Sequence, residues 1–370
     1  MALQTGDHRD LGRLHWPLLF VVICIAGLGV WNLASAGQHG TAGHLAMWRT
    51  QLEWIGIGAA FAAALLWLDY RWLLQIAYPF YAIVLALLVG VMLKGRSVMG
   101  ARRWLDLGPM HLQPSELAKI AVILALSRYF HEDDNDKGYS LRHLWRPGIL
   151  LLAPVALIMR EPDLGTGLVT AAIGMSLILF ARVRWASVLT IAGTGLAGAV
   201  AGWFWFFKSY QKKRVMTFLN PEGDALGAGY HAAQSVIAVG SGQATGKGWG
   251  QGTQNRLSFL PEQHTDFIFS VWAEEHGFRG AAILVALYAA LVLVALDVAS
   301  KARERFGAFL SVGVAALFFW HAFINIGMVS GMVPVVGVTL PLMSYGGSSV
   351  VANLIGVGIV LNVSLRRFMF

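Results

Sequence analysis

A short polar run leads directly into apolar residues at one point of the chain. His264, Thr265 and Asp266 come immediately before Phe267 and two further apolar residues. A carboxylate in partly dehydrated surroundings has a raised pKa, which makes it a better proton acceptor for a hydroxyl group. Asp266 is therefore a candidate general base. The alternative is a helix N-cap, since Thr-Asp before an apolar run fits a helix start. His264, two residues after Glu262, is a weak metal-ligand candidate.

Ionisable residues also lie before an apolar run that begins near residue 114, and within its first turns. Arg102 and Arg103 carry guanidinium forks that suit phosphate oxygens; the alternative is snorkelling beside Trp104 as a membrane-belt residue. Glu116 and Lys119, three residues apart, share one face of a helix. Ionisable groups inside a span are costly, so they usually pair and face a cavity. We therefore expect an ion pair here, either structural or at a site.

Three further segments contain candidate functional groups. Lys212 and Arg214 belong to a basic run that suits contact with lipid headgroups or with a substrate phosphate. Asp163 either caps the helix that follows it or takes a direct part in catalysis. The stretch 334–349 is rich in glycine, proline and serine at membrane depth, where irregular backbone survives only if it is buried in protein or lines a polar cavity.

Composition identifies the elements that must position these groups. Apolar residues make up 56 % of the chain and charged residues 13 %, about half the share of ordinary soluble domains. The charges are clustered, which leaves apolar runs near the roughly twenty residues that a bilayer-spanning helix needs. The sequence therefore predicts an all-α polytopic membrane protein of about ten transmembrane helices, forming one domain over residues 1–370. The expected spans are 16–36, 52–68, 72–93, 114–130, 147–160, 166–181, 186–206, 280–299, 307–330 and 348–365.

The long loop at 207–266, between the seventh and eighth spans, is unusual for a connector because loops of this length are mostly functional or disordered. Its glycines permit close approach of backbone amides to a ligand, or else form a flexible coil. No phosphate-binding glycine motif of a soluble nucleotide site follows a strand. The single Cys24 excludes an internal disulfide and a thiolate metal cluster.

Charge gives the expected orientation and partners. The net charge of +8 suggests anionic lipid or phosphate partners, and nucleic acid is excluded because the basic residues lie between spans and form no soluble basic face. Short basic loops at 69–71, 182–185 and 300–306 favour the cytoplasmic side for these turns. The basic loops 94–113 and 207–266 then lie outside. An inverted molecule remains the alternative, since basic residues divide evenly between the two sides.

A set of short motifs follows in order along the chain. They are Gly100-Ala-Arg-Arg-Trp-Leu, Gln113-Pro-Ser-Glu, Glu161-Pro-Asp-Leu-Gly-Thr-Gly, Gly227-Ala-Gly-Tyr-His, Gln234-Ser, Gly240-Ser-Gly, Gly246-Lys-Gly, Gly252-Thr-Gln, Leu260-Pro-Glu, His264-Thr-Asp-Phe-Ile-Phe, Ala273-Glu-Glu and Ser344-Tyr-Gly-Gly-Ser-Ser. Taken together, these motifs resemble the shape, elongation, division and sporulation (SEDS) family of peptidoglycan glycosyltransferases. The tripeptides at 229–231 and 252–254 resemble its elongation branch more than its division branch.

The resemblance implies a GT-C-like fold and a site on the periplasmic face of the bacterial inner membrane. It implies that Asp266 deprotonates the GlcNAc 4-hydroxyl of lipid II, which attacks a donor anomeric carbon with inversion and release of undecaprenyl pyrophosphate. Arg102, Arg103 and Lys119 would stabilise the leaving group. A divalent cation (Mg²⁺ or Mn²⁺) is a candidate cofactor, and no organic cofactor is expected. The other residues expected to bind substrate are Trp104, Glu116, Asp163, Lys212, Arg214 and His264.

The resemblance also implies protein partners, namely a class B penicillin-binding transpeptidase and the rod-complex membrane proteins MreC and MreD. A lipid II flippase is the alternative function, favoured only by the ionisable pair in the fourth span. A scaffold without catalytic activity would explain the spans but not the loop chemistry.

Overall fold

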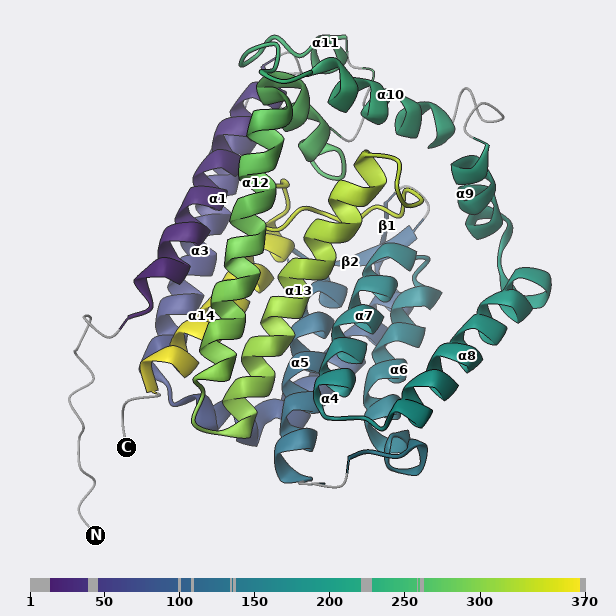
Figure 1. Ribbon diagram of the computed structural model, residues 1–370. Coiled ribbons are helices and arrows are strands. Elements are labelled where there is room, and N and C mark those ends of the chain that lie inside the picture. The colour runs from purple at the N-terminus through teal and green to yellow at the C-terminus, as the bar shows by residue number, and fades with distance from the viewer. Residues whose placement is uncertain are drawn as a thin grey trace.

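The protein is a bundle of long helices that run between two ends (Figure 1). The computed structural model describes residues 14–38, 46–98, 101–107, 110–133, 135, 138–220, 228–257, 259 and 263–366. The bundle helices are α1 (Trp16–Ala36), α3 (Met47–Trp67), α4 (Tyr70–Lys94), α5 (Pro114–Glu132), α6 (Trp145–Arg160), α7 (Leu164–Phe180), α8 (Trp185–Ala201), α12 (Ile268–Ser300), α13 (Arg305–Val329) and α14 (Gly347–Arg366).

Each of the ten expected apolar segments forms one of these helices. Seven of the described helices are long and apolar enough to cross a membrane, namely α1, α3, α4, α12, α13, α14 and α8 together with the π-helical turn that continues it to Trp205. Helix α5 is more polar, because its 19 residues include Glu116, Lys119, Arg128 and Glu132. Helices α6 and α7 have only 16 and 17 residues. The chain is a helical multi-pass membrane protein.

One helix boundary differs clearly from the prediction. The eighth span was expected at 280–299, but α12 begins at Ile268 and continues to Ser300. Its direction changes at Gly277, whose φ of 62° and ψ of −163° are not helical. The polar residues Glu274 and Glu275 therefore lie within the first part of α12, where both side chains are buried. The apolar run on which the predicted span 280–299 was based begins only after this kink.

Strands were not predicted, yet the segment between α4 and α5 contains a small antiparallel sheet. Its strands are β1 (Arg96–Val98), β2 (Ala101–Leu107) and β3 (Met110–Leu112), in the order β1-β2-β3. Trp104 of β2 pairs with Arg96 of β1, and Leu105 pairs with Leu112 of β3. The available signal was the Gly-Pro dipeptide in the sequence at 108–109, since this dipeptide is typical of turns.

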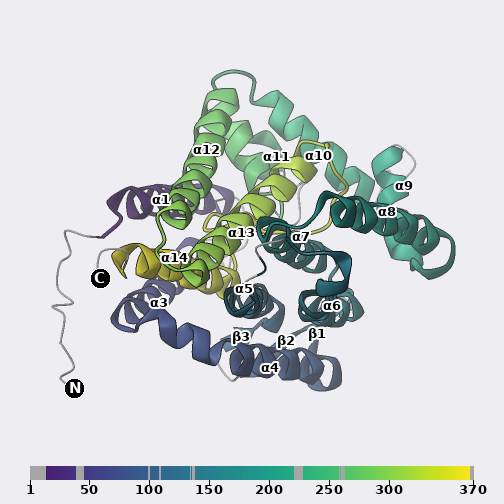
Figure 2. The same ribbon diagram turned by 60° about the horizontal axis from the view of Figure 1, so that its bottom comes forward.

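Helices α5 and α13 lie at the centre of the bundle and pack against each other (Figure 2). Helix α12 packs against α13 and α1, while α14 packs against α3. Helix α8 leans away from the other helices in both views and leaves its apolar side chains exposed, among them Trp185 (81 %) and Leu189 (70 %). Such a surface on a membrane protein faces lipid, whose tails are as apolar as leucine.

The two ends of the bundle differ. Helices α9 (Ser209–Leu219), α10 (Ala228–Ser241) and α11 (Thr253–Arg256) gather at one end, here called the loop end (Figure 1). The opposite end consists of short turns joined by ion pairs, including Arg71 with Glu304 at 2.5 Å and Arg366 with Asp69 at 2.8 Å. These pairs connect turns that are far apart in sequence, as expected if they share one side of a membrane.

Much of the long loop is ordered against α12. The backbone N–H of Lys247 donates to the Glu274 carbonyl (3.0 Å), and its Nζ forms an ion pair with the Glu274 carboxylate at 2.6 Å. The N–H of Phe278 donates to the Gln243 carbonyl (2.7 Å). For residues 243–247 the flexible-coil interpretation is therefore wrong, because this part of the loop is fixed to the first half of α12.

Candidate active site

An irregular segment, Val336–Thr339, is contacted by polar side chains from several helices. It follows α13 and has no regular secondary structure, and Val338 is 3 % exposed. The expectation of irregular backbone is confirmed for residues 334–346, which are buried or half-buried in the protein. The segment's carbonyl groups accept hydrogen bonds from polar side chains of neighbouring helices, so its position depends on side chains that are distant in sequence.

Asp266 lies beside this segment, two residues before α12 begins. Gly337 has a φ of +74°, and a Cβ placed there would be 3.1 Å from Asp266 Oδ2. Asn325 Nδ2 donates both to the Asp266 carbonyl (2.9 Å) and to the Val338 carbonyl (2.6 Å). The helix N-cap is Phe267 and not Asp266, so the capping interpretation is wrong. The half-buried carboxylate of Asp266 is instead held next to the glycine of the segment.

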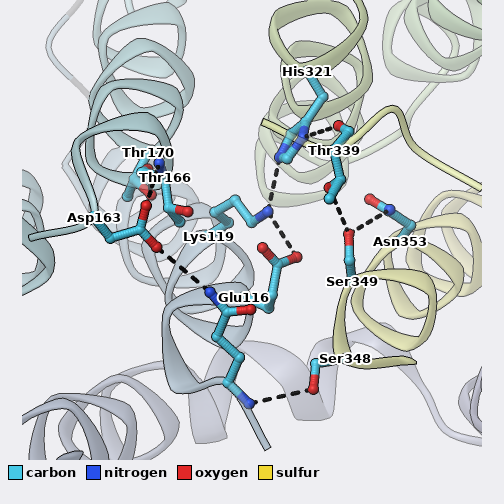
Figure 3. Close-up of polar contacts among 11 residues, drawn as sticks. Glu116, Lys119, Asp163, Thr166, Thr170, His321, Thr339, Ser348, Ser349 and Asn353 are labelled. Carbon is cyan, nitrogen blue, oxygen red and sulfur yellow. Dashed lines mark hydrogen bonds and ion pairs between the residues drawn. The ribbon is translucent and has the colours of Figure 1, made fainter. Parts of the chain in front are cut away.

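Glu116, Lys119 and His321 form a buried polar cluster next to the segment (Figure 3). Lys119 Nζ lies 2.8 Å from Glu116 Oε2 and 2.7 Å from His321 Nε2. His321 Nδ1 lies 3.0 Å from the Thr339 carbonyl, which can only accept. The proton of a neutral His321 is therefore on Nδ1, and Nε2 accepts from the Lys119 ammonium. The predicted Glu116–Lys119 ion pair is confirmed, and through His321 it is connected to the segment.

Asp163 is the centre of a second polar group, at the start of α7. Its Oδ1 accepts from the N–H of Thr166 (3.3 Å), so Asp163 caps α7 as expected from one of the two interpretations. Gln113 Nε2 donates to Asp163 Oδ2 at 3.5 Å, and Arg103 Nη1 lies 3.9 Å from Oδ1. Figure 3 shows Asp163 at the start of α7, beside Thr166. This group places Arg103 next to the first turns of α5 and α7.

Glu161 adds a buried carboxyl to this second group. It is 3 % exposed, and among the residues that the structure describes neither of its oxygens has a hydrogen-bond partner. Burial raises the pKa of Glu161 to about 8; the nearby charge of Asp163 raises it further, while Arg103 lowers it. The Glu161 carboxyl is therefore protonated over much of the neutral pH range, and Asp163 is left as the charged partner of Arg103.

The remaining predicted residues lie at different distances from the segment. Arg214 Nη1 donates to the Val336 carbonyl (3.1 Å), so this arginine is part of the group. His264 packs its ring against Tyr345 at 6.1 Å between centroids. Lys212 lies over the Trp203 ring at 6.0 Å, away from the segment. Trp104 lies in β2 and is half-buried, and the Arg102 side chain lies outside the described residues.

Two residues of the group were missed in the sequence analysis. His321 and Asn325 are four residues apart on α13, and they hold the carbonyls of Thr339 and Val338. Both are buried. The signal was present in the sequence, because a polar residue inside a transmembrane segment is costly and usually functional or paired. It was not used because the apolar length of 307–330 was sufficient for the span prediction.

A metal cage is not formed by the part of the chain that the structure describes, since no three His, Cys, Asp or Glu side chains there are grouped to hold an ion. The carboxylate of Glu116 is already paired with Lys119, and that of Asp163 faces Arg103. Any divalent cation would therefore depend on ligands from a bound phosphate, as Mg²⁺ often does. The cation stays a prediction.

The comparisons with known proteins cover nearly the whole chain. Residues 13–368 match the model of the cell cycle protein family of FtsW, RodA and SpoVE. The chain is 40 % identical to the peptidoglycan glycosyltransferase MrdB of Escherichia coli over 352 residues, which is 95 % of this chain and 93 % of that protein.

The chain belongs to the SEDS family.

Two solved structures agree with this membership. The SEDS chain in a structure described as "Structural coordination of polymerization and crosslinking by a peptidoglycan synthase complex" superposes with a TM-score of 0.83 at 32 % identity, over 96 % of this chain and 99 % of that chain. The rod shape determining protein RodA of Thermus thermophilus superposes with a TM-score of 0.71 at 30 % identity, over 96 % and 98 % of the two chains. The SEDS fold therefore positions the groups described above.

Proposed function

We propose that this SEDS protein polymerises lipid II into β-1,4 glycan strands during cell elongation, with Asp266 as the general base. Its family membership makes it a peptidoglycan glycosyltransferase. The observation that carries the residue-level proposal is the position of Asp266. Its carboxylate lies beside Gly337, in a segment that is also held by Arg214 and, through Thr339, by the Lys119 cluster.

In this proposal the 4-hydroxyl oxygen of the acceptor GlcNAc attacks the anomeric carbon of the donor. The hydroxyl proton passes to the Asp266 carboxylate, the new β-1,4 bond forms with inversion, and the bond to undecaprenyl pyrophosphate breaks. The leaving pyrophosphate gains negative charge, which is best stabilised by cations placed in advance. We assign this role to Arg102, Arg103 and Lys119, with Arg214 and Lys212 towards the outer face.

The roles of the other candidates follow from their surroundings. Asp163 orients Arg103, because its carboxylate faces that guanidinium and is itself fixed by the start of α7. Glu116 holds Lys119 in place through their ion pair. His264 and Trp104 are assigned to contacts with the sugars, since both are half-buried rings near the loop end. A divalent cation, Mg²⁺ or Mn²⁺, would supply further positive charge to the leaving pyrophosphate.

The proposed topology has ten crossings in one domain, is GT-C-like, and places the loop end on the periplasmic side of the bacterial inner membrane. Support comes from the direction of the helices: the Trp16 end of α1 and the Arg366 end of α14 both lie at the opposite end from α10 and α11 (Figure 1). The turns at that opposite end carry short basic stretches, as the positive-inside rule requires for the cytoplasmic side.

We also propose a class B penicillin-binding transpeptidase as the partner, with MreC and MreD as further members of the assembly. Support comes from the similarity to the chain from a peptidoglycan synthase complex, whose description names both polymerisation and crosslinking. Separate enzymes for these two steps would need to work on the same strand, so a stable complex is expected.

The experiment compares polymerase with flippase. Purified protein with its transpeptidase partner receives labelled lipid II in detergent, and products are separated as glycan strands; the same protein in vesicles is tested for movement of labelled lipid II across the bilayer. We expect strands in detergent and no movement above empty vesicles. Transport without strand formation would overturn the proposal and establish the flippase.

A further inference from the structure

A large cavity opens at the end of the bundle opposite to Asp266. Its volume is about 780 Å³, within the range of small-molecule sites. The cavity lies between α4, α5, α6 and the short helix η2 (Leu141–His143). Figure 2 shows α4, α5 and α6 side by side. Its lining includes Tyr78, Tyr129, Arg142 and Arg146. None of these residues takes part in the proposed polymerisation.

The cavity lining contains two arginines, Arg142 and Arg146, and two carboxylates, one of which is paired with an arginine outside the lining. Glu132 is neutralised by Arg128, whose Nε lies 2.7 Å from Glu132 Oε1. Asp133 accepts a hydrogen bond from the Tyr129 hydroxyl at 3.1 Å. Across the described residues, Arg142 and Arg146 make no ion pair, and both are exposed.

Arg146 has the geometry of a preorganised phosphate ligand. Its guanidinium lies 5.2 Å from the centroid of the Trp145 ring, and such stacking limits its conformational freedom. The first turn of α6 contains no acidic residue and its N-cap, Leu144, makes no side-chain cap hydrogen bond, so the helix dipole adds to the positive potential there. Two guanidinium groups and a helix start therefore face one cavity, which suits a phosphate better than a carboxylate-rich ligand.

An apolar surface continues from the cavity along α6. Trp145, Ile149 and Leu152 are 59 %, 57 % and 63 % exposed and recur at the spacing of one helix face. From Trp145 to Leu152 this face extends over roughly 10 Å at the α-helical rise. A soluble anion would gain nothing from such a surface, whereas the acyl chain of a lipid whose phosphate lies in the cavity would cover it.

We propose that this cavity binds the headgroup phosphate of an anionic phospholipid, with Arg142 and Arg146 as the phosphate ligands and an acyl chain along α6. With the orientation proposed above, this lipid belongs to the cytoplasmic leaflet. The binding itself depends on neither the orientation nor the polymerase activity, so it can fail or succeed independently of them.

The test is native mass spectrometry of the full-length protein in detergent, with phosphatidylglycerol and phosphatidylcholine supplied in competition. The variant Arg142→Gln with Arg146→Gln removes both proposed ligands. The control Lys301→Gln with Arg303→Gln removes the same charge from an exposed turn at the same end. We expect the wild type and the control to retain one phosphatidylglycerol. The cavity variant should bind it about thirtyfold more weakly, or about 2 kcal/mol, at roughly 1 kcal/mol for each arginine.

Three results would overturn the proposal. The first is equal loss of phosphatidylglycerol in the cavity variant and in the control, which would mean a general charge effect. The second is equal retention of phosphatidylcholine and phosphatidylglycerol by the wild type, which would remove the anionic preference. The third is displacement of the bound lipid by inorganic phosphate alone, which would identify the cavity as a site for a free anion. Size-exclusion profiles of all variants establish that each is folded, and strand formation from lipid II is expected to be unchanged in the cavity variant.

Discussion

Replacing Lys119 with methionine removes a buried charge while it keeps most of the side-chain volume. The Lys119 side chain is 1 % exposed and that of its partner Glu116 is 6 % exposed, so both charges are shielded from water. Without Lys119, the Glu116 carboxylate has lost its cation and His321 Nε2 has lost its donor. Breaking a buried ion pair at one partner costs about 3–5 kcal/mol. We expect Lys119→Met to lower the free energy of unfolding by that amount.

A double-mutant cycle isolates the pair. Glu116→Gln combined with Lys119→Met leaves no charge at these two positions, so it should be less destabilised than the sum of the two single variants, with a coupling of about 1–3 kcal/mol. The measurement is chemical unfolding in detergent, followed by tryptophan fluorescence. Lys301→Met is the matched control, because Lys301 forms an exposed pair with Asp297 at 2.6 Å. Exposed pairs contribute about 0–1 kcal/mol.

The reasoning would be refuted by a Lys119→Met variant that loses no more stability than Lys301→Met. Strict additivity of the Glu116 and Lys119 substitutions would refute the pairing in a different way, since it would mean that the two groups do not interact. Either result would also remove the argument that Glu116 holds Lys119 in place at the proposed site.

The pKa of Glu161, raised to about 8, predicts a pH dependence. A carboxyl whose pKa is raised on folding contributes its full stability below its unfolded value of 4.5 and loses it as the pH rises through about 8. Glu161→Gln should therefore flatten the decline in unfolding temperature over that interval, and an unchanged decline would show that another group causes it. Gly337→Ala should cost about 1 kcal/mol or more, because of its positive φ, and should slow strand formation by crowding Asp266. Gly346→Ala is its control, since the nearest atom is 3.7 Å from an added Cβ, and equal effects of the two substitutions would contradict the role of Gly337. Asp163→Ala should cost about 1 kcal/mol through loss of the α7 cap, measured by thermal unfolding, whereas Asp163→Asn should keep most of it because asparagine also caps.

The membrane helices could be predicted from the sequence because the apolar length that a bilayer requires is a local property. The start of α12 could not. Glu274 is tolerated inside that helix because Lys247 and the N–H of Thr253 bind its carboxylate. Both partners belong to the long loop and lie more than twenty residues before Glu274. No local sequence pattern shows that the loop folds back to supply them.

Only part of the candidate site could be predicted, because only some of its contacts are local in sequence. Glu116 and Lys119 are neighbours on one helix, so their pairing follows from spacing. His321 reaches them from α13, and its other ring nitrogen binds the Thr339 carbonyl. The contact between Arg214 and Val336 likewise joins segments more than a hundred residues apart. Such contacts depend on the tertiary packing of several helices, which spacing along one chain does not determine.

The role of Asp266 is tested most directly by the rate of strand formation in Asp266→Asn. Asparagine keeps the size of the side chain and removes the carboxylate. The assay is single-turnover polymerisation of labelled lipid II, with binding of lipid II measured in parallel. The account predicts a rate lower by about 10²–10⁴-fold, the usual contribution of a general base, with binding retained. A rate within a few fold of the wild type would contradict it.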